Sequence, residues 1–117
     1  MENFPYRDGR LYAEDIPVSD IASAHGTPCY IYSRAALESA FGEYQGALQG
    51  CEHLVCYAVK ANSNLAVLNL LARLGAGFDI VSQGELERVV AAGADLSLIH
   101  ISEPTRPELV SRMPSSA

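Results

Sequence analysis

The sequence predicts an α/β fold built from short strand–helix units, of the kind found in a (β/α)8 barrel. The first observation is that two short apolar runs, 54–59 and 78–81, are rich in β-forming residues and have the length of buried strands. The second is that an amphipathic segment follows each run and ends at a glycine, Gly75 or Gly93. The third is the spacing, because about 22 residues per unit is typical of parallel strands joined by right-handed crossovers.

The residues ahead of these units are predicted to form strands and one short helix. Residues 4–16 are expected to form a strand pair, or a strand with a turn, because the Asp-Gly pair at 8–9 is a turn signal. Ser19 is a candidate N-cap for a short helix that Gly26 closes. Residues 29–32 are a further strand candidate.

A longer helix is predicted for residues 34–48, with Ser33 as its N-cap. Its large apolar side chains recur at helical spacing and fall on one face, which we expect to be buried. They are Leu37, Phe41, Tyr44 and Leu48.

The apolar run 54–59 stops at Lys60, the only lysine in the chain. After it, Asn62 and Asn64 supply turn and N-cap chemistry for the next helix. An amine at the carboxyl end of a buried parallel strand lies where α/β folds place active sites, and there it can act as a nucleophile that forms a Schiff base. A simpler interpretation is a strand-end lysine that emerges into water, and the spacing alone does not separate the two.

Composition excludes several classes of partner. The net charge is −6 with the acidic residues scattered, which argues against a nucleic-acid surface. The first residues show no signal-peptide pattern, and no apolar run has the roughly 18 residues of a membrane helix. Cys29, Cys51 and Cys56 lack the spacing of metal ligands, so we expect no metal and reduced thiols in a cytoplasmic protein, with Cys56 in the core of its strand.

Several stretches resemble a known family in combination. They include Cys-Tyr-Ala-Val-Lys-Ala-Asn-Ser-Asn at 56–64, Gly-Ala-Gly-Phe-Asp-Ile-Val-Ser-Gln-Gly-Glu at 75–85 and Ala-Gly-Ala-Asp at 92–95. Together with pieces of the first 33 residues, they resemble the diaminopimelate decarboxylases. These are pyridoxal-phosphate (PLP) enzymes that share the fold of alanine racemase and eukaryotic ornithine decarboxylase. The resemblance runs from about residue 4 to about residue 95.

The resemblance implies an alanine racemase-like fold, with a PLP-binding (β/α)8 barrel and a second β-domain. It implies decarboxylation of meso-2,6-diaminopimelate to L-lysine and CO2 by a homodimer, with no nucleic-acid or membrane partner. An ornithine- or arginine-type decarboxylase of the same fold remains an alternative, as does a non-catalytic PLP-binding barrel protein. The residues that select the distal group of the substrate are expected mostly outside this stretch.

The resemblance also assigns candidate site residues. It implies that Lys60 binds PLP covalently and that Asp79 lies beside the cofactor. An equally supported role for Asp79 is to tie down the strand end through backbone N–H groups. Ala58, Asn62 and Ser82 are weaker candidates for the pocket wall. Ser82 has a competing role as a helix N-cap, in a capping box with the glutamate three residues later.

Three segments are expected: strands of the β-domain over 1–32, the first barrel units over 33–95, and a non-matching tail over 96–117. The tail contains Ser-Leu-Ile-His-Ile-Ser-Glu-Pro-Thr-Arg, which resembles translated sequencing-adapter read-through. We therefore expect the tail to be artefactual or disordered, with His100 incidental, although residues 98–101 can mimic a strand. Because most of a barrel, its phosphate loop and its partner-subunit residues are missing, we expect the 117-residue chain alone to be inactive.

Overall fold

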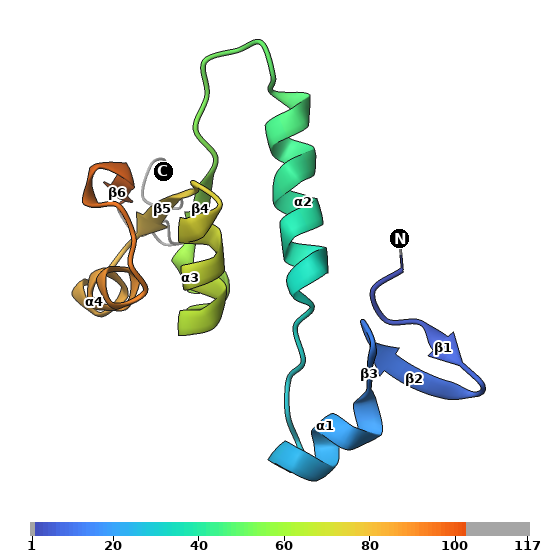
Figure 1. Ribbon diagram of the computed structural model, residues 1–117. Coiled ribbons are helices and arrows are strands. Elements are labelled where there is room, and N and C mark those ends of the chain that lie inside the picture. The colour runs from blue at the N-terminus through green and yellow to red at the C-terminus, as the bar shows by residue number, and fades with distance from the viewer. Residues whose placement is uncertain (1, 103–117) are drawn as a thin grey trace, which may run out of the picture. The chain divides into compact units, whose positions relative to one another are not determined.

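The computed structural model describes residues 2–102, which fall into two compact units, one up to Glu52 and one from His53 on. Figure 1 shows an antiparallel sheet and two helices in the first unit, and a second sheet with its helices in the other. The units divide later than the boundary predicted between residues 32 and 33. This division reflects contacts within the chain, and the assignment of 1–32 to a separate β-domain stays a prediction.

The first unit begins with a three-stranded antiparallel sheet in the order β1-β2-β3. Its strands are β1 (Tyr6–Arg7), β2 (Arg10–Ala13) and β3 (Ile16–Pro17). Asp8 and Gly9 both have positive φ, 53° and 78°, as a two-residue hairpin turn of the primed type requires. The turn predicted at 8–9 is therefore confirmed.

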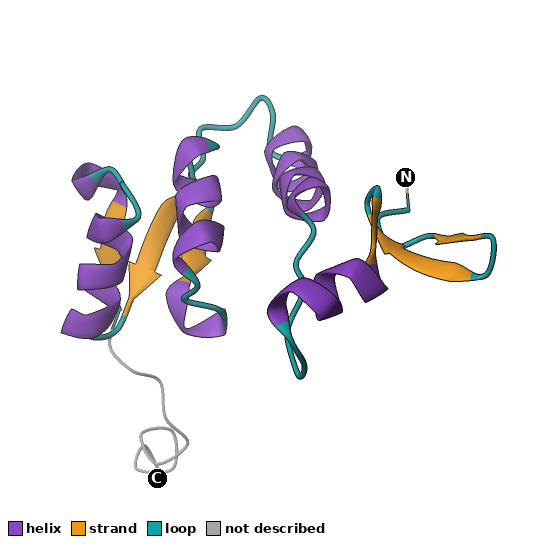
Figure 2. Cartoon of the chain, turned by 60° about the horizontal axis from the view of Figure 1, so that its bottom comes forward, coloured by secondary structure: helices purple, strands orange, loops and turns teal. Residues whose placement is uncertain are grey.

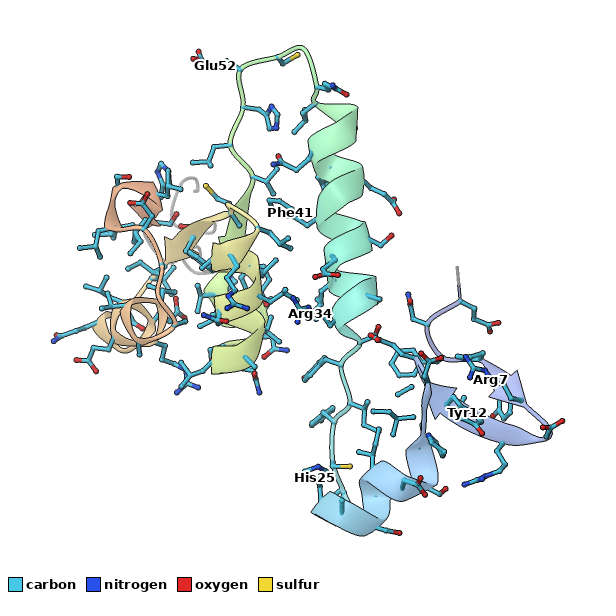
Figure 3. All side chains as sticks on the ribbon, in the orientation of Figure 1. Arg7, Tyr12, His25, Arg34, Phe41 and Glu52 are labelled. Carbon is cyan, nitrogen blue, oxygen red and sulfur yellow. The ribbon has the colours of Figure 1, made fainter. Side chains whose placement is uncertain are left out.

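Helix α1 (Val18–His25) follows directly from the sheet. The predicted N-cap role of Ser19 is wrong, because Ser19 lies inside the helix and its hydroxyl accepts a hydrogen bond from Arg10 Nη2 at 3.0 Å. Gly26 ends the helix at φ 80°, as predicted. Figure 3 labels His25 in the last turn of α1.

The strand predicted at 29–32 is wrong. These residues form no strand, and the side chain of Tyr30 is 89% exposed. The cause is the lack of a pairing partner, since a strand is stable only when its backbone N–H and C=O groups pair with a neighbour.

Helix α2 (Arg34–Ala47) begins at Ser33, as predicted. Ser33 Oγ accepts a hydrogen bond from Ala36 N at 3.0 Å. A second acceptor was not predicted: Glu14 Oε2 accepts from Ser33 Oγ at 2.6 Å and from Ala35 N at 2.9 Å. These bonds, that of Ser33 first, hold the pKa of Glu14 below its usual value. The turn between β2 and β3 is thereby attached to the start of α2.

The predicted burial of one face of α2 is only partly confirmed. Phe41 is buried, but Tyr44 is 65% exposed and Leu48 is exposed as well. Figure 3 labels Phe41 in the middle of the helix. Helical spacing places these side chains on one face, but burial also needs an element to cover that face.

The second unit is a parallel sheet in the order β4-β5-β6, covered by helices. Figure 2 shows α3 and α4 against the same face of the sheet. The parallel strand–helix alternation predicted from the sequence is confirmed. The elements are β4 (Cys56–Ala58), η1 (Val59–Ala61), α3 (Leu65–Arg73), β5 (Gly77–Ile80), α4 (Gln83–Ala91), η2 (Leu96–Leu98) and β6 (Ile99–Ile101).

The core of this unit contains large apolar side chains from the sheet and from both helices. Burying each one stabilises the fold by about 1.5–3 kcal/mol. Phe78, Leu68, Val59 and Val89 are the largest side chains that are fully buried. The amphipathic pattern predicted for the two helices is therefore confirmed in part: Leu68, Leu71 and Val89 are buried, whereas Leu65 is 44% and Val90 is 47% exposed.

Two boundaries differ from the prediction. The strand predicted at 54–59 is only β4, because the backbone turns into η1 at Val59. In the segment 96–117, the first residues form η2 and β6, so the expected disorder is absent there. The rest of the tail, from residue 103 on, lies outside the described residues, and whether the tail is artefactual stays a prediction.

Candidate functional site

The carboxyl ends of the three parallel strands meet at one edge of the sheet. Lys60 lies in η1, directly after β4. Ser82 follows β5, and Ser102 follows β6. The sequence therefore predicted correctly that Lys60 and the end of the second strand share this edge.

Lys60 itself is exposed, and within residues 2–102 it takes part in no salt bridge. The residue before it, Val59, is fully buried and anchors the turn in the core. Asn62 N donates to Val59 O at 3.1 Å, and the hydroxyl of Tyr57 donates to Asn62 O at 2.9 Å. The amine is thus carried by a short turn that is fixed on both sides.

The residues after this turn start α3 through two asparagine side chains. Asn62 Oδ1 accepts from Asn64 N at 3.0 Å. Asn64 Oδ1 then accepts from Ala66 N at 2.9 Å and from Val67 N at 3.2 Å. The predicted N-cap is confirmed, and Asn62, a candidate for the pocket wall, has a clear role in the turn.

Ala58 and Asp79 lie side by side. They are register partners on β4 and β5, so their side chains emerge from the same face of the sheet. Asp79 is half-buried, and its carboxylate accepts a hydrogen bond from the hydroxyl of Ser102. The strand-end role predicted for Asp79 used backbone N–H groups, whereas the observed donor is a side chain. Ser102 was missed because it belongs to the segment expected to be disordered.

Two further side chains belong to this face of the sheet. Cys56 is in register with Gly77, two residues before Ala58, and His100 is in register with Asp79. The prediction that Cys56 is a core residue is wrong, because it is exposed and lies on the face opposite to the buried side chains of Phe78 and Ile80. Partial burial of the thiol raises its pKa, and the nearby charge of Asp79 raises it further.

Ser82 caps α4, as predicted. Its Oγ accepts a hydrogen bond from Glu85 N at 3.1 Å. The reciprocal half of the predicted capping box is shifted by one residue, because Glu85 Oε1 accepts from Val81 N at 2.9 Å and not from Ser82 N. The hydroxyl of Ser82 is therefore engaged in its own helix, and its role in a pocket wall stays a prediction.

The described part of the chain, residues 2–102, offers neither a membrane span nor a metal cluster. No helix there is long and apolar enough to cross a membrane. Among the same residues, no group of three or more His, Cys, Asp or Glu side chains is arranged to hold a metal ion.

Comparison with known families decides the assignment. The family model described as "Pyridoxal-dependent decarboxylase, pyridoxal binding domain" matches residues 34–113, more than half of the chain. The chain belongs to the pyridoxal-dependent decarboxylases. Within this family, Lys60 and Asp79 both lie in the matched pyridoxal-binding region.

Curated relatives of this decarboxylase chain are named diaminopimelate decarboxylase. The protein from Pseudomonas aeruginosa is 64% identical over 95 residues, which are 81% of this chain and 23% of that protein. The protein from Vibrio cholerae is 57% identical over 103 residues, which are 87% of this chain and 25% of that protein. The chain therefore spans about a quarter of the length of these relatives.

Solved structures of diaminopimelate decarboxylases resemble the decarboxylase chain in fold as well. That from M. jannaschii, in complex with L-lysine, has a TM-score of 0.82 and 30% identity, covering 98% of this chain and 28% of that one. The structure from Helicobacter pylori, also in complex with L-lysine, has a TM-score of 0.70 and 36% identity. The match covers 85% of this chain and 25% of that one.

The strand-end edge of this decarboxylase chain fits PLP in its chemistry. Lys60 offers an exposed amine on a fixed turn. Ala58, two residues before it, is exposed and carries only a methyl group, so it leaves the sheet surface beside the amine almost bare. Asp79 adds a negative charge on the same face. A flat aromatic ring needs this kind of open surface next to the amine that holds it.

Proposed function

We propose that this chain is part of a diaminopimelate decarboxylase, which removes one carboxylate of meso-2,6-diaminopimelate as CO2 and leaves L-lysine. The single observation that carries the proposal is the position of Lys60 in the matched pyridoxal-binding region, at the carboxyl end of a parallel strand. The relatives at 54–64% identity support this substrate, as do the solved structures in complex with L-lysine.

In the proposed reaction, Lys60 holds the cofactor through a covalent bond from its Nζ atom. It releases the cofactor when the amino group of the substrate takes its place. PLP, when bound, supplies the electron sink that takes up the charge left behind as CO2 departs. The turn around Lys60 keeps the amine at one place on the strand-end edge through both events.

The two neighbouring residues have different tasks in this proposal. Asp79 provides a carboxylate on the same face of the sheet as Ala58, and its negative charge stabilises a positive charge on the nitrogen of Lys60. Its hydrogen bond from Ser102 fixes the direction of that carboxylate. Ala58 leaves room for the ring beside the sheet.

We further infer that the strand–helix units of this chain are the first parts of a PLP-binding (β/α)8 barrel in a homodimer. The parallel pairing of β4, β5 and β6 supports the barrel. We infer a cytoplasmic enzyme because Cys29 and Cys56 form no disulfide, as expected in a reducing compartment. By the same proposal, the 117-residue chain produced by itself does not decarboxylate the substrate.

An ornithine- or arginine-type decarboxylase is the second candidate for the substrate. A viral arginine decarboxylase, from Paramecium bursaria Chlorella virus, matches with a TM-score of 0.59, but its 24% identity supports only a common fold. A non-catalytic PLP-binding barrel would keep the covalent bond to Lys60 and lose turnover. The substrate assay below separates these three functions.

The test uses the complete protein that carries this sequence. After loading with PLP and reduction with borohydride, peptide mass mapping should find the cofactor on Lys60. Release of CO2 should be fastest from meso-diaminopimelate, compared with L-ornithine and L-arginine at equal concentration.

Lys60→Ala and Lys60→Arg are the matched variants, since the second keeps a positive charge without a Schiff-base amine. Both should lose the visible absorbance of the lysine-bound cofactor and nearly all turnover. Cofactor found on another lysine would refute the assignment, and labelling without CO2 release from any of the three substrates would support the non-catalytic protein.

A further inference from the structure

We propose that Tyr57 is a positioning residue, which holds the Lys60 turn in place through its hydroxyl group. This inference rests on the proposed function, because it assigns to Tyr57 a task in the reaction of Lys60. Nothing in the sequence pattern singled out Tyr57, since an aromatic residue in a buried strand is ordinarily only a packing residue.

The hydrogen bond of Tyr57 joins residues on either side of Lys60 in the sequence. Tyr57 is three residues before Lys60, and its hydroxyl donates to the carbonyl oxygen of Asn62, two residues after it, at 2.9 Å. Inside this loop, Asn62 N donates to Val59 O at 3.1 Å. Lys60 is thus enclosed by two hydrogen bonds and by a buried neighbour, while its own side chain stays exposed.

The ring of Tyr57 is itself held. It lies edge-on to the ring of Phe78, with 6.4 Å between the centroids and an angle of 89° between the planes. The two residues are also register partners on β4 and β5, and Phe78 is fully buried. The hydroxyl is therefore presented to Asn62 from a rigid support, which makes the bond preorganised rather than incidental.

Tyr57 acts through Lys60 and not on the substrate. Side chains alternate along a strand, so Tyr57 emerges on the face opposite to Ala58 and Asp79. A catalytic amine must stay close to one productive geometry, and a small displacement lowers the rate steeply. Loss of the hydroxyl should therefore slow the reaction of Lys60 without removing any group from the proposed site.

The experiment compares Tyr57→Phe with the wild type in the complete protein. This substitution removes only the hydroxyl and keeps the ring contact with Phe78. Tyr44→Phe is the matched control, because it makes the same chemical change on an exposed side chain of α2. Three quantities are measured: amide hydrogen exchange in the peptide over 59–64, the acylation rate of Lys60 in the cofactor-free protein, and kcat and KM.

In Tyr57→Phe we expect several-fold faster exchange over 59–64, a changed acylation rate of Lys60, and a melting temperature close to that of the wild type. We expect kcat to fall roughly five- to tenfold, as for the loss of one hydrogen bond, with KM within about twofold. A merely structural role would lower the melting temperature and leave kcat unchanged. Tyr44→Phe should change none of these values.

Unchanged exchange over 59–64, or faster exchange with unchanged kcat, overturns the proposal. Failure of the proposed function has a different signature. If PLP is absent from Lys60 in the wild type, the decarboxylase assignment fails, while exchange and acylation still decide whether Tyr57 holds the turn.

Discussion

Gly77 is the position where the sheet of the second unit tolerates a change least. A Cβ atom placed on Gly77 would lie 2.8 Å from Leu98 O, 2.9 Å from Cys56 Sγ and 3.2 Å from Leu54 Cδ2. The first of these atoms belongs to the backbone beside β6, so it can move away only if the strands separate. Gly77→Ala should therefore strain the pairing of β5 with both of its neighbours.

The expected cost follows from overpacking. Extra methyl groups in a well-packed region typically destabilise a protein by 1–3 kcal/mol. We expect Gly77→Ala to cost about 2–3 kcal/mol, because two of the three contacts are shorter than Cβ atoms ordinarily allow. Adding Cys56→Ala removes the sulfur contact but not the carbonyl contact, so the double variant should recover only part of the loss.

The assay is urea unfolding of the complete protein in its cofactor-free form, followed by circular dichroism. Gly84→Ala is the control, because in α4 the nearest atom to an added Cβ is Ser82 Oγ at 3.9 Å. That variant should gain a few tenths to about 1 kcal/mol from helix propensity. Equal stability of Gly77→Ala and the wild type would refute the close approach of the three strands at this residue.

Two further predictions concern carboxylates. Asp79→Asn should lower kcat on the order of tenfold or more while the fold stays intact. An unchanged kcat with a lower melting temperature would instead show that Asp79 has a structural role, in which its hydrogen bond from Ser102 stabilises the end of the strand. The pKa of Glu14 is lowered because Ser33 and Ala35 donate hydrogen bonds to its charged form. These bonds therefore stabilise the folded protein fully at a pH above the pKa that Glu14 has in the unfolded chain. The stabilisation is lost as the pH falls through the lower pKa that Glu14 has in the folded protein. Glu14→Gln should therefore reduce the melting temperature at pH 7 but not in acid below the folded pKa; a reduction that stays constant with pH would contradict this account.

Local chemistry explains what could be predicted from the sequence. Ser33 and Asn64 cap helices because their side-chain oxygens reach backbone N–H groups two or three residues later. Gly26 and Gly75 end helices with positive φ, which few other residues adopt. The position of Lys60 followed from the abrupt end of an apolar run. All of these signals lie within a few residues of the feature that they predict.

Features that depend on distant partners could not be predicted in this way. Glu14 caps a helix that begins far along the chain, and no local pattern joins it to Ser33. Residues 29–32 have the composition of a strand, but pairing needs a neighbour that composition does not reveal. Cys56 was assigned to the core because its strand is apolar, yet which face is covered depends on where the helices pack. The roles of Lys60, Asp79, Ala58 and Ser82 stay predictions until the variants are measured.

The two strand–helix units of the second sheet also exchange side-chain hydrogen bonds. Arg88 Nε of α4 donates to Ser63 O, just before α3, at 2.8 Å, while Asn69 Nδ2 of α3 donates to Ala92 O, just after α4, at 2.9 Å. Neither helix can separate from the sheet alone without breaking a hydrogen bond to the end of the other helix. The two helices should consequently unfold locally as one cooperative segment. A substitution on α4 should then change how often the loop next to Lys60 unfolds.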